Sequence, residues 1–185
     1  MIDDIKQDAE HRMQSALDAL LRELTGIRTG RATPALVDRL QVDYYGAATP
    51  LNQLASISAP EPRTLVIQPW DRGSMQAIEK AIQKSDLGLT PNNDGQLIRL
   101  SIPQLTEERR KSLVKMTRTK VEDGKVAIRN VRRDAVDQVK DLTKEKMIGE
   151  DDERRAHHDI DAVTKRFTEE ADRIGTSKES EILEV

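Results

Sequence analysis

The sequence predicts an α+β protein, in which a small mixed domain is inserted into a bundle of three long helices. Apolar residues recur every three or four positions near the N-terminus and again in two segments after residue 105. Residues 31–104 lose that period and show short apolar runs between Gly and Pro residues. Charged residues are 34% and aromatic residues 2% of the 185 residues, which is typical of long helices with an aliphatic buried stripe. We therefore expect one domain from 1–30 with 105–185, and another from 31–104.

The first helix is expected over residues 2–27. Its apolar positions form a single narrow stripe: Ile2, Ile5, Ala9, Met13, Leu17, Leu20, Leu24 and Ile27. A helix of this length extends about 39 Å at 1.5 Å per residue. One narrow stripe has to pack against other helices to be buried.

The inserted segment is expected to be a small mixed β/α domain with one short helix. Apolar alternation and β-branched residues predict strands near 40–45, 63–68 and 97–102, and a further apolar stretch covers residues 54–57. Residues 74–85 have the spacing of a helix, whereas Gly46, Pro50 and the segment 87–95 are predicted as turns.

The second helix is expected to begin after Thr106, its predicted N-cap, and to run for about 40 residues, or about 60 Å. Glu107 and Glu108 suit the positive end of its dipole. Its expected stripe is Val114, Thr117, Val121, Gly124, Ile128, Val131, Ala135, Val139 and Leu142. Gly124 should weaken the helix by about 1 kcal/mol relative to Ala.

The third helix is expected after Gly149, with acidic residues 150–153 at its start. Its stripe is Ala156, Ile160, Val163, Phe167, Ala171 and Ile174. Gly175 and the residues after it weaken the prediction beyond that point. Three stripes imply three helices that bury one another, joined to the inserted domain by two connections. These connections are expected to act as a hinge, at Thr29, Gly30, Arg31, Pro103 and Gln104.

Several classes of protein are excluded by what the sequence lacks. Without cysteine there is no disulfide, thiolate chemistry or cysteine-ligated metal. The acidic N-terminus and the lack of an apolar run of about 20 residues predict a cytoplasmic protein that does not enter a membrane. Neither a phosphate-binding glycine loop nor a nucleophile elbow is present, and adjacent His157 and His158 point about 100° apart on a helix. We expect no enzyme activity, no metal site and no cofactor.

A basic segment carries the functional prediction. Residues 106–147 have a net charge of +5, whereas residues 148–185 have a net charge of −6. On the second helix, helical spacing places seven cations near one line: Lys111, Lys115, Arg118, Lys125, Arg129, Arg132 and Lys140. Arg133 lies at the edge of this row. Guanidinium groups bind two phosphate oxygens at once, so an exposed row predicts contact with an RNA backbone.

Two alternatives stay open from the residues alone. The row could be a solvated surface that pairs with the acidic third helix, and the chain would then be a helical protein–protein interaction module without rRNA affinity. Arg28 and Arg31, near the connection, could bond helix-end carbonyls or contact further phosphates.

The whole chain resembles the bacterial ribosome recycling factor family. The motifs that carry the resemblance follow one another in the order Ile27–Pro34, Tyr44–Gly46, Thr49–Leu51, Gln53–Ala55, Ser85–Leu89, Leu105–Lys111, Arg129–Ala135, Glu150–Asp152 and Arg154–Arg155. The resemblance implies an L-shaped molecule, with a three-helix bundle as one arm and a β/α/β sandwich as the other. It also implies a monomer without a catalytic site.

The resemblance further implies a function in translation after termination. Family members bind the ribosome at large-subunit rRNA and, with elongation factor G and GTP, split the subunits so that mRNA and tRNA leave. Elongation factor G uses the GTP, and the inserted domain swings. Residues that match the family's rRNA contacts are Arg110, Arg129 and Arg132, with Arg28 and Arg31 near the connection. Together with the row, the expected ribosome-binding set is Arg28, Arg31, Arg110, Arg118, Lys125, Arg129, Arg132 and Arg133.

Overall fold

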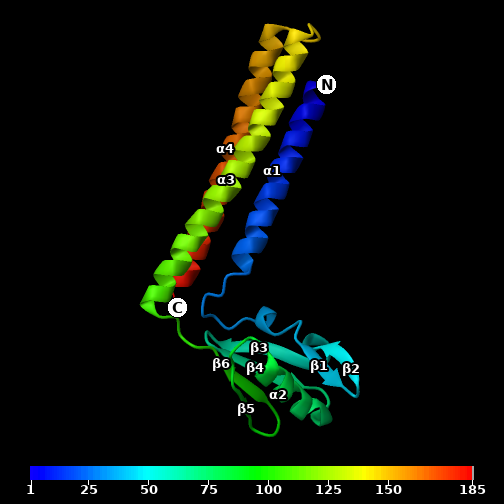
Figure 1. Cartoon of the computed structure of the whole chain (residues 1–185), viewed down its shortest axis with the longest axis vertical. Helices are drawn as coiled ribbons and strands as arrows, with labels where there is room; N and C mark the ends of the chain where they lie inside the picture. The colour runs from blue at the N-terminus through cyan, green and yellow to red at the C-terminus, as the bar shows by residue number, and fades with distance from the viewer. Residues whose placement is uncertain (185) are drawn as a thin grey trace. The chain divides into compact units, whose positions relative to one another are not determined.

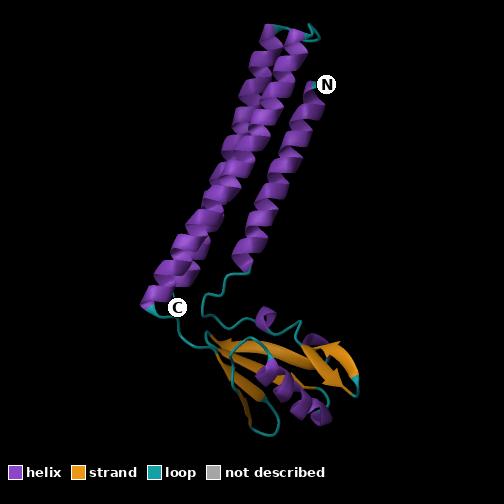
Figure 2. Ribbon diagram, viewed as in Figure 1, coloured by secondary structure: helices purple, strands orange, loops and turns teal. Residues whose placement is uncertain are grey.

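The structure is a computed structural model that describes residues 1–184. The chain forms two compact units, one made of residues 1–28 with 107–184 and the other of residues 29–106. Figure 1 traces the chain through both units, and Figure 2 separates the helices from the strands. Residue 185, which the expected helical domain included, lies outside the described residues. The expected fold class, a three-helix bundle with a β-sheet domain inserted, is confirmed.

The helical unit contains α1 (Ile2–Thr25), α3 (Glu107–Lys144) and α4 (Glu150–Leu183). Each of these helices packs against the other two. A short connection after Lys144 reverses the chain, so that α3 and α4 are antiparallel neighbours (Figure 1). Their aliphatic stripes meet along the axis and bury Met13, Leu24, Ile128, Ile160 and Ile182 almost completely. Burial of these stripes is the main stabilising term, since the outward faces remain charged.

Two expectations about the helices need correction. On α3 the buried residue of the first turns is Leu113, whereas Val114 is only half-buried. The expected weakening of the third helix beyond Gly175 is wrong, because α4 continues to Leu183. Gly175 is buried, and an ideal Cβ placed there would lie 2.6 Å from Cγ2 of Val121. The glycine therefore serves close packing of α4 on α3 instead of ending the helix.

The small unit has two sheets and one helix. The first sheet is a hairpin of β1 (Gln41–Tyr44) and β2 (Ala47–Pro50). The second is antiparallel, with the order β3 (Ala55–Glu61), β4 (Thr64–Pro69), β6 (Ile98–Ser101) and β5 (Pro91–Asn93). Helix α2 (Met75–Lys84) contacts β1, and short 3₁₀ turns occupy Pro34–Leu36, Leu51–Gln53 and Arg72–Ser74 (Figure 2).

The core of the small unit follows the period of each element. Alternate residues Leu65 and Ile67 of β4 are fully buried, as are Ile98 and Leu100 on β6. Helix α2 adds Ile78 and Ile82, one turn apart, to the same cluster. This shared core joins the helix to the four-stranded sheet.

Two strands, β2 and β5, lie where the sequence predicts turns, and β3 overlaps the apolar stretch at residues 54–57. Gly46, Pro50 and residues 87–95 were expected to be turns, yet Ala47–Pro50 and Pro91–Asn93 pair with β1 and β6. Both are short edge strands with a proline, and pairing with a stronger neighbour supplies their hydrogen bonds. Tyr45 and Gly46 form the two-residue hairpin turn, with φ of 50° and 86°. Two positive φ values match a type I′ turn, whose twist suits a hairpin.

Asp71 ties the hairpin tip to the start of the Arg72–Ser74 turn. Its carboxylate accepts hydrogen bonds from the hydroxyls of Tyr44 (3.1 Å) and Tyr45 (3.2 Å), and from the Gly73 N–H (2.9 Å). The Gly73 bond, then those of the tyrosines, lower the pKa of Asp71 below its ordinary value. Bonding to the same carboxylate raises the pKa of Tyr44. The hairpin tip is thus held by charge-assisted hydrogen bonds.

Candidate nucleic-acid interface

The cation row lies on the flank of α3 that faces α4. Helix α3 buries Thr117, Val121 and Ile128 in the bundle, and the row residues lie on average about a quarter of a turn away from that stripe. Most of the row is exposed, whereas Lys125 is half-buried. Because α3 is one uninterrupted helix, the row is held along one line.

Five of the row cations have carboxylate partners. Three of these partners come from α4: Asp161 lies 2.6 Å from Arg132, Asp172 3.0 Å from Lys125, and Glu179 2.7 Å from Arg118. Arg129 pairs with Glu122 (2.6 Å) and Lys111 with Glu107 (3.6 Å), both on α3 itself. The expectation that the row stands free is therefore wrong for these positions. For Arg118, Lys125 and Arg132 the acidic character of α4 explains the difference, because its carboxylates recur at helical spacing opposite the row.

Two cations of the row, and Arg133 at its edge, have no carboxylate partner among the described residues. Lys115, Arg133 and Lys140 are exposed and make no ion pair with any residue from 1 to 184. Arg133 follows Arg132 directly and so lies about 100° further round the helix. These side chains keep their charge available to an external anion.

An open groove between α3 and α4 gathers the central part of the row. Its polar lining holds six cations and three carboxylates: Lys125, Arg129, Arg132, Arg133, Lys140 and Lys165, with Asp137, Asp161 and Asp172. Glu122 and Glu169 pair with Arg129 and Lys165 from outside the lining, so the six cations meet five carboxylates, and the positive surplus comes from Arg133 and Lys140, which are unpaired within residues 1–184. We call this the α3–α4 groove.

Lys165 is a lining residue that the sequence analysis missed. It lies on α4, whose net negative charge hid it. The spacing of α4 could have predicted its position, because Asp161, Lys165, Thr168 and Asp172 lie 4, 3 and 4 residues apart. That spacing puts all four on one helical face.

Arg110 and Arg118 lie outside the lining of the α3–α4 groove. Arg110, in the first turn of α3, is half-buried, and its Nε is buried with no hydrogen-bond partner among the described residues. The hydrogen bond and the charge of Glu179 raise the pKa of Arg118. Both arginines thus belong to the same helix as the groove but to its end near Glu107.

Arg28 lines a different groove of the helical unit. This second groove lies between the end of α1 and the start of α3, and its basic residues are Arg22, Arg28, Arg109 and Lys120. Glu23 also lines it and pairs with Lys120 at 3.4 Å. Arg28 makes no hydrogen bond to a helix-end carbonyl within residues 1–184, whereas Arg31 has an interaction partner. The structure therefore does not bring Arg28 into the row.

The expected hinge residues lie in the two segments that connect the units. Thr29, Gly30 and Arg31 follow α1, and Pro103 and Gln104 follow β6, in stretches without helix or strand. Gly30 has a φ of 78°, in the left-handed region that favours glycine. A residue with a side chain would be strained at this point of the first connection.

Membrane-spanning helices and metal clusters are both absent from the described chain. No helix within residues 1–184 is both long and apolar enough to cross a membrane. Over the same residues, no cluster of three or more His, Asp or Glu side chains is placed to hold a metal ion.

Comparisons with known proteins give a consistent match. The family model described as ribosome recycling factor matches residues 20–183. A ribosome-recycling factor of Thermomicrobium roseum is 56% identical, and one of Carboxydothermus hydrogenoformans is 55% identical; each alignment covers 100% of both chains.

Solved structures match over the same length. A solution structure of the ribosome recycling factor has a TM-score of 0.77 and 40% identity, and covers 100% of this chain and 98% of its own. A second match has a TM-score of 0.65 and 49% identity, and covers 99% of each chain. This second structure comprises models for the T. thermophilus ribosome recycling factor and the E. coli elongation factor G bound to the E. coli post-termination complex.

Proposed function

The chain belongs to the ribosome recycling factor family, and from that premise we propose that its helical unit binds ribosomal RNA along the α3–α4 groove. As a member of the family it is a non-catalytic translation factor that acts in ribosome recycling. The partners are the post-termination ribosome and elongation factor G, which a related factor meets in the second structural match. Elongation factor G supplies the GTP hydrolysis, and together they split the subunits in the cytoplasm.

The observation that carries this proposal is the surplus of cations in the α3–α4 groove. Arg133 and Lys140 line it without a partner among residues 1–184, and the six lining cations exceed their carboxylates even when Glu122 and Glu169, outside the lining, are counted. An RNA backbone presents one negative charge per nucleotide, so a linear groove with a positive surplus matches it in sign and in shape.

The ion pairs with α4 do not block this function. Arg132 and Asp161 keep 45% and 53% of their side-chain surface exposed. Exposed ion pairs contribute only about 0.2–1 kcal/mol. A phosphate that offers two oxygens to a guanidinium replaces such a carboxylate at little cost. The carboxylates hold the guanidinium groups in place until RNA arrives.

The same ion pairs are the observation that favours the alternative function. If α4 satisfies the row completely, the helical unit is a protein–protein interaction module without rRNA affinity. The two functions differ in what Asp161 does. In the rRNA-binding function, Asp161 competes with phosphate for Arg132. In the protein–protein interaction module, Asp161 has no effect on RNA binding.

Binding to purified large ribosomal subunits tests the proposal. Arg132→Ala should weaken binding about tenfold, because a charge-assisted hydrogen bond to phosphate is removed. Asp161→Asn should strengthen binding roughly twofold, because it frees Arg132. The slope of log affinity against log salt should fall by about 0.7–0.9 for each phosphate that the variant no longer neutralises.

Arg12→Ala is the matched control. Arg12 pairs across helices with Asp134 at 2.9 Å, and the two side chains are 43% and 51% exposed, nearly the values of Arg132 and Asp161. It lies outside the lining of the α3–α4 groove. Equal losses of affinity for Arg12→Ala and Arg132→Ala would count against the groove as the contact surface.

Subunit splitting with elongation factor G and GTP measures the complete function. The chain should accelerate splitting, and Arg132→Ala should reduce this in proportion to its lower affinity. If Arg132→Ala binds normally, or if splitting is the same without the chain, the proposed role of the groove fails.

We also propose that the connections at Thr29–Arg31 and Pro103–Gln104 allow the small unit to swing during splitting. The chain has no cysteine, so a Gly26→Cys, Gln104→Cys double variant, with one exposed site in each unit, offers only these two sites to a series of bifunctional thiol cross-linkers of increasing length. The cross-linked protein should bind the ribosome and fail to split it. Full splitting activity would rule out the swing.

A further inference from the structure

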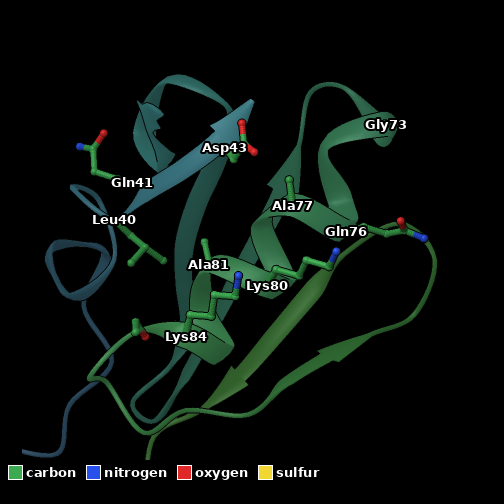
Figure 3. A pocket seen from close by; sticks show the side chains of 10 residues that line it. Leu40, Gln41, Asp43, Gly73, Gln76, Ala77, Lys80, Ala81 and Lys84 are labelled. Carbon is green, nitrogen blue, oxygen red and sulfur yellow. The ribbon is translucent and has the colours of Figure 1, made fainter. Parts of the chain in front are cut away.

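The small unit has a groove of its own between strand β1 and helix α2 (Figure 3). The residues that line it come from both elements and from their ends: Leu40, Gln41, Asp43, Gly73, Gln76, Ala77, Lys80, Ala81, Lys84 and Ser85. None of them belongs to the cation row or to the α3–α4 groove. We call this the β1–α2 groove.

Strand β1 presents an unpaired edge to this groove. Tyr44 pairs with Ala47 across the two-residue turn, so this pair exchanges hydrogen bonds and the next pair along does not. The alternation continues, because Leu51 N–H donates to the Leu40 carbonyl at 2.9 Å. The backbone groups of Gln41 and Asp43 therefore point away from β2. They have no backbone partner within residues 1–184.

The two β1 residues that line the groove are those with outward backbone groups. Gln41 and Asp43 belong to the lining, whereas Val42 and Tyr44 do not. The groove thus runs beside two N–H and two C=O groups at the spacing of a strand. An open edge of this kind is a template for another strand.

The floor of the groove is made of small residues. Ala77 and Ala81, one turn apart on α2, project on the side of β1 in Figure 3. Both are half-buried against the core. Longer side chains there would fill the space beside β1, so the alanines keep the groove open.

The rim of the groove carries two cations without partners. Lys80 and Lys84 are exposed, and neither forms an ion pair with a residue of the described chain. They are four residues apart on α2, a spacing at which like charges repel. Among the described residues of the lining, the only carboxylate is that of Asp43, which already accepts the Gly46 N–H at 2.9 Å.

We propose that the β1–α2 groove binds an extended, acidic segment of a partner protein, which adds to β1 as a strand. Its backbone pairs with the outward groups of Gln41 and Asp43, and alternate carboxylates reach Lys80 and Lys84. This is strand addition in a strand–helix groove, where backbone bonds give affinity and side chains give specificity.

A peptide fits this groove better than a nucleic acid. The edge offers N–H and C=O groups that alternate at the spacing of a strand, which a polypeptide backbone matches and a sugar–phosphate backbone does not. No aromatic side chain on which a base could stack is found among the lining residues within 1–184. The chemistry therefore selects a polypeptide, and the lysines select an acidic one.

The test uses the full chain and a panel of eight-residue peptides that alternate glutamate with valine, isoleucine, leucine or threonine. Binding is followed by fluorescence anisotropy at low salt, and hydrogen exchange is read at single amides. At least one peptide should bind and slow exchange of the Gln41 and Asp43 amides. Lys80→Glu with Lys84→Glu should weaken its binding at least tenfold.

Three controls separate strand addition from general charge attraction. Arg63→Glu reverses an exposed cation of the same unit outside the groove, and should change the affinity less than twofold. N-methylation of the peptide amides in one alternate register should abolish binding, whereas the other register should tolerate it. Ala81→Leu should block binding by filling the floor, with thermal melting used to verify that the variant is folded.

Several results would overturn the proposal. These are no binding of any peptide at millimolar concentration, unchanged exchange at Gln41 and Asp43, and equal effects of Arg63→Glu and of the double variant Lys80→Glu with Lys84→Glu. Stronger binding of an eight-nucleotide oligouridylate to the same residues would identify the groove as an RNA site instead.

Discussion

Each unit of the chain is stabilised internally by a different kind of interaction. In the helical unit, the helices contact one another through aliphatic side chains and through ion pairs across the interfaces, such as Lys6 with Asp159 and Arg12 with Asp134. In the small unit, the elements are joined by backbone pairing of strands and by one compact core. The Arg99–Asp94 pair of that unit is local, at 3.6 Å.

This difference bears on the kind of site each unit can offer. A surface of exposed ion pairs can exchange its carboxylates for phosphates, because each pair is weak. A hairpin with an open edge offers fixed backbone donors and acceptors, which a second polypeptide can match. The helical unit is thus suited to a polyanion, and the small unit to a peptide.

The largest expected effect tests whether the two cores are independent. Ile67 is fully buried in the central strand β4, and Ile67→Ala should destabilise the small unit by about 3–4 kcal/mol. Amide exchange should accelerate throughout β3, β4 and β6, while the amides of α3 and α4 keep their protection. Loss of protection in both units would mean that they unfold together.

A smaller effect is expected where α4 packs closely on α3. Gly175→Leu should destabilise the helical unit by about 2–3 kcal/mol, because a Cβ already lies 2.6 Å from Val121. Gly124→Ala is the matched variant, since its Cβ would lie 3.2 Å from Cδ2 of Leu20. At position 124, the gain of about 1 kcal/mol in helix propensity from Ala should offset the slight crowding of the new Cβ against Leu20. Urea unfolding followed by circular dichroism measures both, and equal destabilisation by the two variants would contradict the tighter packing at Gly175.

Acid should affect the hairpin tip of the small unit through Asp71. The pKa of Asp71 is lower in the folded state than in the unfolded chain, where it is near 3.8. The contribution of Asp71 to the free energy of unfolding is therefore complete above pH 3.8, and it is lost as the pH falls through the lowered pKa. Asp71→Asn should remove this component of the pH dependence. Urea melts between pH 5 and pH 2, read at the amides of Tyr44 and Gly73, compare the two proteins. Parallel curves would show that Asp71 does not contribute.

The smallest effect concerns the ion pairs of the helical unit. Arg132→Ala and Arg12→Ala should each change its free energy of unfolding by less than about 1 kcal/mol, and about 0.5 M NaCl should reduce the difference further. Thermal melting with and without salt provides the measurement. A loss above about 2 kcal/mol for Arg132→Ala would mean that its pairing with Asp161 is structural, and would contradict the proposed exchange of carboxylate for phosphate.

Buried positions were predictable where the apolar residues of a single helix or strand follow the period of that element. The stripe of α1 was predicted well, with Met13, Leu17 and Leu24 buried as expected. By contrast, β2 and β5 were missed, since Pro50 and Pro91 give no strand signal of their own. The groove beside β1 was also missed, because its edge is defined only after the hairpin register is known.

The sequence by itself determined three helices, an interrupting sheet domain, and a line of cations on α3. These features follow from the side chains of one segment and the fixed geometry of its helix or strand. Only the tertiary structure decided which cations meet carboxylates of α4, and that Gly175 serves packing instead of ending a helix. Both depend on what lies across an interface. The axial position of one helix against another is set by packing of all three, which no single segment encodes.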